Sequence, residues 1–355
     1  MPNKTIIFCA DGTWNSAHDS DDPLNENSNV YKFFDCLPGY AEGEKSDQEK
    51  NYTNHAEIVQ CAKYINGVGN GTTKIENYVA GALGTGLVVR IVRGYTYVSR
   101  LYNPGDKIVL VGFSRGAYTV RALAGLIANK GLLSNTPPLS GDEAHRQGTK
   151  VWFDHYEEKG KTLAKIATVL TNLSGFLQSA HTKVGALREV SDIHAVAVWD
   201  TVGSLGIPSV KPDEHGDAFQ FTDNVLHEKV KHGRHAISMH ERRATFQPCI
   251  WSERDNVKQF LFAGAHADVG GGYVVDESGL SDLALDWMLG EASALGVVFD
   301  GAKLARIKGN ADAEMHTPWL DDPWRQDPKN NARIFPGHVV THDSVKRRGD
   351  GAIAR

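Results

Sequence analysis

Hydrophobic positions along the chain gather in short, nearly continuous runs, and each run ends at glycine or at polar residues. These runs predict buried strands over residues 5–10, 58–65, 107–111, 193–199 and 257–263. Between the runs, apolar residues recur at helical spacing over 86–101 and 120–131. Near-continuous apolar strands that alternate with helices are typical of a parallel sheet covered on both faces. The pattern therefore predicts an α/β fold around a mostly parallel sheet.

Two other stretches have different patterns. Residues 41–57 are rich in Glu, Lys, Asp, Gln and Asn and predict a solvated loop. Residues 140–190 have a helical pattern in which Leu163 and Ile166 share one face. Because 355 residues can form one large α/β domain with inserted segments, we expect a single domain over 1–355. The helical stretch over 140–190 is then predicted to be a cap within that domain.

The composition narrows the class of protein. Hydrophobic residues make up 41% of the chain and charged residues 23%, which is close to the average of soluble globular proteins. No stretch approaches the roughly 20 apolar residues that a membrane span requires. A net charge of -5 without a basic patch argues against nucleic acid as a partner. The first residues lack the pattern of a signal peptide, so we expect a cytoplasmic protein in the producing cell, with its four cysteines reduced.

The segment Gly112-Phe113-Ser114-Arg115-Gly116 stands between an apolar strand and an amphipathic helix. This is the setting of a nucleophile elbow, in which a strained turn exposes the serine hydroxyl at the end of the sheet. A serine hydroxyl also needs a base that takes its proton. The motif in this context predicts Ser114 as the nucleophile of a serine hydrolase.

An acid and a base are expected after such a nucleophile, in the order Asp then His, at the ends of later strands. Asp200 and His266 each follow a predicted strand in that order. Both would face the elbow, because the carboxyl ends of parallel strands meet at one edge of the sheet. His342 stays open as a rival base, with Asp268 as its acid.

Acyl transfer also needs N–H donors for the oxyanion, one from the residue after the nucleophile and one from a loop after a neighbouring strand. Arg115 is predicted to supply the first donor. Gly12 and Thr13, in the turn after the first strand, are predicted to supply the second and to line the site. This chemistry requires no cofactor and no metal ion, and we expect none.

The turn Asp11-Gly12-Thr13 also has a second interpretation. Phosphatases of the haloacid dehalogenase type have a similar turn, but their nucleophilic aspartate stands two residues earlier, where this chain has Cys9. Oxygen and imidazole ligands suit divalent metals, and the chain offers such ligands at Asp11, Asp200, His266 and Asp268. A metal-dependent phosphoesterase is therefore the alternative function.

Several blocks of the chain, in order, carry a resemblance to a known family. They are Phe8-Cys9-Ala10-Asp11-Gly12-Thr13-Trp14-Asn15, Gly67-Val68-Gly69, Gly112-Phe113-Ser114-Arg115-Gly116-Ala117, Val198-Trp199-Asp200-Thr201-Val202-Gly203 and His266-Ala267-Asp268-Val269-Gly270-Gly271-Gly272-Tyr273. Over most of its length the chain resembles the catalytic domain of bacterial type VI secretion lipase effectors, a large α/β-hydrolase family. One further block departs from the family, since His240 stands where its members tend to have an aspartate.

The resemblance implies an α/β-hydrolase fold and a phospholipase that hydrolyses acyl esters of membrane lipids, which we expect to be a phospholipase A. The family's Ser-Asp-His triad falls on Ser114, Asp200 and His266. The implied partners are a phospholipid or other ester substrate, a membrane surface in transient contact, and an immunity or secretion-carrier protein. The implied route out of the producing cell is type VI secretion, as an antibacterial effector.

Overall fold

The fold is built around one large sheet in the computed structural model, which describes residues 3–13, 15, 17, 22–67, 81–158, 179, 182–203, 225–321, 325 and 331–348. Within these ranges, nine strands form the sheet in the order β11-β10-β9-β8-β5-β1-β4-β3-β2. Every pairing from β11 to β4 is parallel, and β3 and β2 add an antiparallel hairpin at one edge. The predicted mostly parallel α/β fold is confirmed.

The strands of this sheet are short. They are β1 (Thr5–Ala10), β2 (Ala41–Glu44), β3 (Asp47–Asn54), β4 (Glu57–Ile65), β5 (Lys107–Phe113), β8 (Ile193–Trp199), β9 (Val230–Ser238), β10 (Val257–Phe262) and β11 (Val340–Thr341). A separate small antiparallel pair consists of β6 (Leu132–Leu133) and β7 (Leu187–Arg188).

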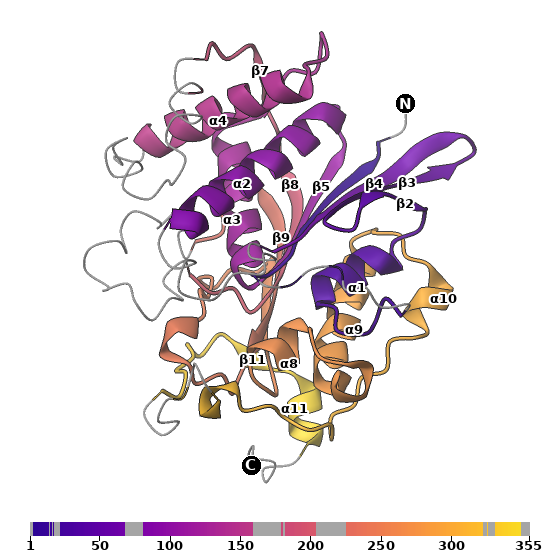
Figure 1. The fold of residues 1–355 in the computed structure, drawn as a ribbon, viewed down its shortest axis with the longest axis vertical. Coiled ribbons are helices and arrows are strands. Elements are labelled where there is room, and N and C mark those ends of the chain that lie inside the picture. The colour runs from indigo at the N-terminus through magenta and orange to yellow at the C-terminus, as the bar shows by residue number, and fades with distance from the viewer. Residues whose placement is uncertain are drawn as a thin grey trace.

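Helices cover both faces of the large sheet (Figure 1). One face packs against α2 (Gly81–Leu101), α3 (Ser114–Lys130) and α4 (Gly141–Glu158), which share a core with the sheet. The other face packs against α1 (Asn29–Cys36) and α9 (Gly279–Ala294). Shorter helices are α8 (His266–Gly270), α10 (Gly301–Leu304) and α11 (Asp343–Arg347), with 3-10 turns η3 (Ala244–Phe246), η4 (Val275–Glu277) and η5 (Pro318–Leu320).

The sheet topology brings the motifs to one edge. The chain runs from β1 to β4 on one side and then returns to pair β5 on the other side of β1. Such a change of direction leaves a crevice at the carboxyl ends of the strands, where ligands of α/β sheets bind. The turn after β1, the elbow after β5, and the segments after β8, β9 and β10 all start at this edge.

The five strands predicted from apolar runs are all present, with ends that differ by two residues or fewer. The loop predicted over 41–57 is wrong, because that stretch forms β2, β3 and the start of β4. Its polar residues fit an edge hairpin, where β2 is exposed throughout and Lys50 of β3 is buried. Lys50 Nζ donates to the carbonyl oxygens that end α1, at Phe34, Asp35 and Leu37.

The predicted cap lies only partly within the described residues. Its first part is α4, whose apolar side chains enter the core shared with α2 and α3. Residues 159–178, 180 and 181 lie outside the described ranges, so the cap stays a prediction. None of the helices in the part of the chain that the structure describes is long and apolar enough to cross a membrane.

Candidate active site

Ser114 occupies the turn between β5 and α3. Its φ of 56° lies in the left-handed region, which residues with a Cβ rarely adopt. The turn packs closely against the first strand, since a Cβ on Gly116 would lie 2.1 Å from the Ala10 carbonyl oxygen. This is the strained strand-to-helix geometry that a nucleophile elbow requires.

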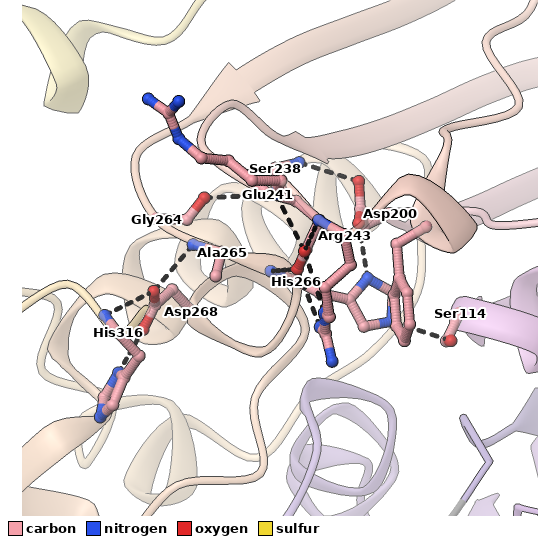
Figure 2. Close-up of polar contacts among 12 residues, drawn as sticks. Ser114, Asp200, Ser238, Glu241, Arg243, Gly264, Ala265, His266, Asp268 and His316 are labelled. Carbon is pink, nitrogen blue, oxygen red and sulfur yellow. Dashed lines mark hydrogen bonds and ion pairs between the residues drawn. The ribbon is translucent and has the colours of Figure 1, made fainter. Parts of the chain in front are cut away.

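A chain of hydrogen bonds joins three of the predicted residues (Figure 2). His266 Nε2 lies 2.8 Å from Ser114 Oγ, and His266 Nδ1 lies 2.5 Å from Asp200 Oδ2. Because a carboxylate only accepts, Nδ1 donates to Asp200, and Nε2 of the neutral ring accepts from the Ser114 hydroxyl. All three residues are buried, and none is more than 6% exposed. The arrangement can take a proton from Ser114.

The imidazole of His266 contacts two aromatic rings. The ring centroid of Phe113 lies 4.5 Å from that of His266, and the Phe246 ring meets it edge-on at 4.9 Å. Burial lowers the pKa of His266 below its ordinary value, although the hydrogen bond to Asp200 acts in the opposite direction. The ring is therefore neutral near pH 7, which is the form that acts as a general base.

Asp200 directly follows β8 and is completely buried. Asp200 Oδ1 accepts from Ser238 N at 3.0 Å and from Arg333 Nη1 at 2.7 Å, while Oδ2 accepts from Arg333 Nη2 at 3.0 Å. Burial opposes ionisation, but the charge of Arg333 and the hydrogen bond from His266 outweigh it and hold the pKa of Asp200 well below its ordinary value. Asp200 is a carboxylate at neutral pH.

A second buried carboxylate fixes the backbone of His266 (Figure 2). His266 N donates to Glu241 Oε2 at 3.1 Å, and Arg243 donates to both oxygens of Glu241, at 2.9 and 2.8 Å. His240, the departure from the resembled family, accepts a hydrogen bond at Nδ1 from Gly264 N at 3.0 Å. These contacts tie the segment after β9 to the loop that carries His266.

His342 and Asp268 lie outside this hydrogen-bonded chain. His342 caps α11, where its Nδ1 accepts from Ser344 N at 3.3 Å, and its ring stacks on Phe262. Asp268 pairs with His316, with 2.6 Å between Asp268 Oδ1 and His316 Nδ1. The two residues therefore have partners other than each other, which argues against the rival assignment.

The alternative metal-binding set is not assembled either. Asp11 accepts from Tyr64 Oη at 2.6 Å and from Gly12 N at 2.7 Å. Asp200 and His266 bond to each other, as described above. Across the described ranges, no three His, Cys, Asp or Glu side chains are grouped so that they could hold a metal ion.

The turn after β1 lies beside the elbow, since a Cβ on Gly12 would be 3.2 Å from Ser114 Cβ. The N–H of Gly12 already donates to Asp11. Thr13 is buried, and its hydroxyl has no hydrogen-bond partner among the residues that the structure describes. Arg115 is the second residue of α3 and directly follows Ser114. The predicted oxyanion roles of Gly12, Thr13 and Arg115 stay a prediction.

Four residues around the hydrogen-bonded chain of Ser114, His266 and Asp200 were not predicted from the sequence. Ser238 ends a strand, β9, that the apolar pattern did not reveal. Glu241 and Arg243 follow that strand, and only the resemblance block around His240 gave a signal for this region. Arg333 follows a stretch rich in Asp, Pro and Asn, and no local motif points to it.

Comparisons with known proteins agree with the sequence resemblance. Residues 4–291 match a family model described as "T6SS, Phospholipase effector Tle1-like, catalytic domain". An uncharacterized protein of Saccharomyces cerevisiae, YEL023C, is 26% identical over 246 residues, which are 69% of this chain and 32% of the yeast protein. The chain thus spans about a third of this relative's length. Of the resembling blocks, Trp14, Val68 and Gly69 lie outside the described residues.

Two solved structures are similar to the chain at low sequence identity. An uncharacterized protein from Pseudomonas aeruginosa is 19% identical with a TM-score of 0.47, over 87% of this chain and 49% of that protein. The Tle1 effector bound to the VgrG spike from the Type 6 secretion system is 16% identical with a TM-score of 0.43, over 79% of this chain and 53% of that one. The family match covers well over half of the 355 residues and confirms the predicted resemblance. The chain belongs to the family of type VI secretion phospholipase effectors with a Tle1-like catalytic domain.

Proposed function

We propose that the chain is a serine ester hydrolase of the phospholipase A type, which cleaves acyl esters of membrane phospholipids. Ser114 is the nucleophile, His266 the general base and Asp200 the residue that orients it. The observation that carries the proposal is the unbroken hydrogen-bonded chain from Ser114 Oγ through His266 to a buried Asp200 carboxylate. Membership in a family of phospholipase effector domains supports a phospholipid as substrate.

In the first step, Ser114 Oγ attacks the carbonyl carbon of the acyl ester while its proton moves to His266 Nε2. The tetrahedral intermediate collapses as the bond to the glycerol oxygen breaks, and that oxygen takes the proton from His266. A lysophospholipid leaves, and the fatty acyl group stays on Ser114. Asp200 stabilises the imidazolium that forms between these two events.

In the second step, His266 Nε2 takes a proton from water, and the resulting hydroxide attacks the acyl carbon. The bond to Ser114 Oγ breaks, the serine recovers its proton, and the fatty acid leaves. The negative oxygen formed in each step is stabilised by the N–H of Arg115 and by Thr13, beside Gly12 in the turn after β1. Support for this role is the buried Thr13 hydroxyl, which lacks a partner among the described residues.

Membership in the family also supports proposals about export and partners. We include in the proposal export by type VI secretion, a secretion carrier and an immunity protein as partners, and transient contact with a membrane surface. The solved Tle1 effector is described as bound to a VgrG spike. We also retain a single domain over 1–355 and a cap over 140–190 that controls access of lipid.

The test is hydrolysis of mixed phospholipid vesicles by the purified protein, with products identified by mass spectrometry. The proposal expects free fatty acid and lysophospholipid, no effect of EDTA, and labelling of Ser114 by a fluorophosphonate probe. The Ser114→Ala variant serves as the control and should give neither product nor label. Cleavage of phosphate esters that EDTA abolishes, without labelling, would support the metal-dependent phosphoesterase instead.

A further inference from the structure

We propose that Arg333 is a positioning residue of the triad, which holds the Asp200 carboxylate in the orientation that faces His266. The inference rests on the proposed function, since it assigns a role within the same site. It concerns a residue beyond the part of the chain, residues 4–291, that matches the family. The segment that carries Arg333 therefore contributes directly to the site.

The contacts of Arg333 are two-pronged and fully buried. Its Nη1 and Nη2 donate to the two different oxygens of Asp200, at 2.7 and 3.0 Å. Only 1% of the Arg333 side chain is exposed, and none of the Asp200 side chain. A planar guanidinium that contacts both oxygens fixes the plane of the carboxylate as well as its position. With Oδ1 also bound to Ser238 N, Oδ2 is left to accept from His266.

The same guanidinium also ties down two backbone segments at the site. Arg333 Nη1 donates to the carbonyl oxygen of Ser238 at 2.7 Å, and Nη2 donates to that of Phe246. Ser238 ends β9, and the ring of Phe246 packs edge-on against His266. One residue thus anchors both Asp200, which accepts the hydrogen bond from His266, and the backbone of Phe246, whose ring contacts the imidazole.

The charge of Arg333 has a separate consequence. Burying an unpaired carboxylate costs free energy. Here the Arg333 cation pairs with Asp200 and offsets the negative charge that His266 would otherwise face. Without that cation, the uncompensated carboxylate would stabilise the protonated imidazole more strongly. The charged and titratable groups that face His266 or Asp200 are Glu241, Arg243, Arg333, His235 and Cys249. Glu241 and Arg243 pair with each other, so Arg333 is the cation that acts on Asp200.

Two variants separate the geometry from the charge. Arg333→Met keeps much of the apolar stem but removes the cation, and Arg333→Lys keeps the cation but removes the two-pronged contact. Arg234→Met is the matched control. Arg234 is also a buried arginine that donates to a carboxylate, Glu291, and to two backbone carbonyls, but it lies away from the triad.

The first measurement is an NMR titration of His266 in the Ser114→Ala protein, which does not depend on turnover. Removal of the cation in Arg333→Met should raise the pKa of His266 by about one pH unit. Arg333→Lys and Arg234→Met should leave it near the starting value. An unchanged His266 pKa in a folded Arg333→Met protein would overturn the proposal.

The second measurement is turnover of a soluble ester in the background with Ser114 intact. Arg333→Lys should lower kcat on the order of 100-fold, because small misplacement of a catalytic group has effects of this size, while the acid limb of the pH profile stays in place. Arg234→Met should lower the melting temperature without moving kcat or the acid limb. Wild-type kcat in Arg333→Lys would overturn the positioning role, and this holds even if Arg333→Met does not fold.

The two proposals fail in different ways. If the wild-type protein hydrolyses no phospholipid ester, the proposed function fails, but the titration of His266 still reports whether Arg333 acts through Asp200. If the ester is cleaved and the titration shows no effect of Arg333, only the inference about Arg333 fails.

Discussion

Gly116 of α3 lies against the end of the first strand, so that a Cβ at this position would stand 2.1 Å from the Ala10 carbonyl oxygen and 2.4 Å from that of Asp11. Backbone atoms cannot yield as a flexible side chain can. Gly116→Ala should therefore displace the start of α3, with a loss of stability of about 1 to 3 kcal/mol and a large loss of ester hydrolysis. Thermal unfolding and initial rates measure the two effects.

The same helix offers a matched control for that prediction. A Cβ on Gly125 would meet nothing within 4 Å, so Gly125→Ala should stabilise the protein by up to about 1 kcal/mol through helix propensity. Its activity should stay at the wild-type level. Equal activity in Gly116→Ala and Gly125→Ala would mean that the close contact at Gly116 does not shape the elbow.

The backbone at Ser114 is strained, because its φ of 56° lies in the left-handed region, which residues with a Cβ rarely adopt. Ser114→Ala and Ser114→Gly should both abolish ester hydrolysis, since both lack the hydroxyl. The glycine variant should nevertheless be more stable than the alanine variant, by about 1 kcal/mol, because glycine adopts this conformation without strain. Urea unfolding of the two inactive proteins compares them directly, and an alanine variant at least as stable as the glycine variant would count against a strained turn.

The choice between two histidines can be tested by substitution. His266→Ala should lower kcat on the order of 10⁴- to 10⁶-fold, and the double variant with Ser114→Ala should be hardly worse, because triad members act as a unit. His342→Ala should keep most of the activity, since that ring caps α11 and stacks on Phe262. A deep loss in His342→Ala with substantial turnover in His266→Ala would reverse the assignment.

The pH dependence of the rate follows from the surroundings of His266. The base must be neutral to accept the Ser114 proton, so kcat/KM should rise with pH as His266 loses its proton. Because burial lowers the pKa of His266 from its ordinary 6.5, the midpoint of this acid limb should lie below about 6.5. A soluble short-chain ester is the suitable substrate, since its rate does not depend on a lipid surface. A midpoint above 6.5 would contradict the buried, neutral imidazole.

The sequence predicted the parts of the site that follow apolar strands. Ser114, Asp200 and His266 come just after β5, β8 and β10, and each of those strands ends in apolar residues and pairs with a strand on both sides. The apolar pattern therefore locates the strand ends, and the parallel topology brings those ends to one edge.

Other parts of the fold could not be predicted from the sequence, because the burial of their residues depends on polar partners that are distant in sequence. β9 contains His232, Arg234 and His235, so it is not a continuous apolar run, yet Arg234 is buried through its pairing with Glu291. The hairpin over β2 and β3 is polar and includes Lys50, whose pKa burial lowers to about 8. Pairings of this kind become visible only when the partners are placed in space.

A last prediction concerns the Asp268–His316 pair, which stands beside the triad without joining it. The His316 ring stacks on Tyr273 with 3.6 Å between centroids, and its hydrogen bond with Asp268 raises the pKa of His316 above its ordinary value. A histidine with a raised folded-state pKa adds stability that is fully present below the unfolded pKa, about 6.5, and is lost as the pH rises through the folded pKa. His316→Ala should therefore reduce the free energy of unfolding more at pH 5.5 than at pH 8.5.

His342 supplies the control for this last prediction, because burial lowers its pKa instead. When the folded-state pKa of a histidine is lowered, the unfolded chain binds the proton more readily than the folded chain does. The folded protein therefore loses stability as the pH falls. The loss of stability in His342→Ala should therefore be smaller at pH 5.5 than at pH 8.5, opposite to the trend for His316→Ala. Urea unfolding at the two pH values measures both differences. A His316→Ala effect that stays constant or grows with pH would show that the ion pair with Asp268 does not stabilise the fold.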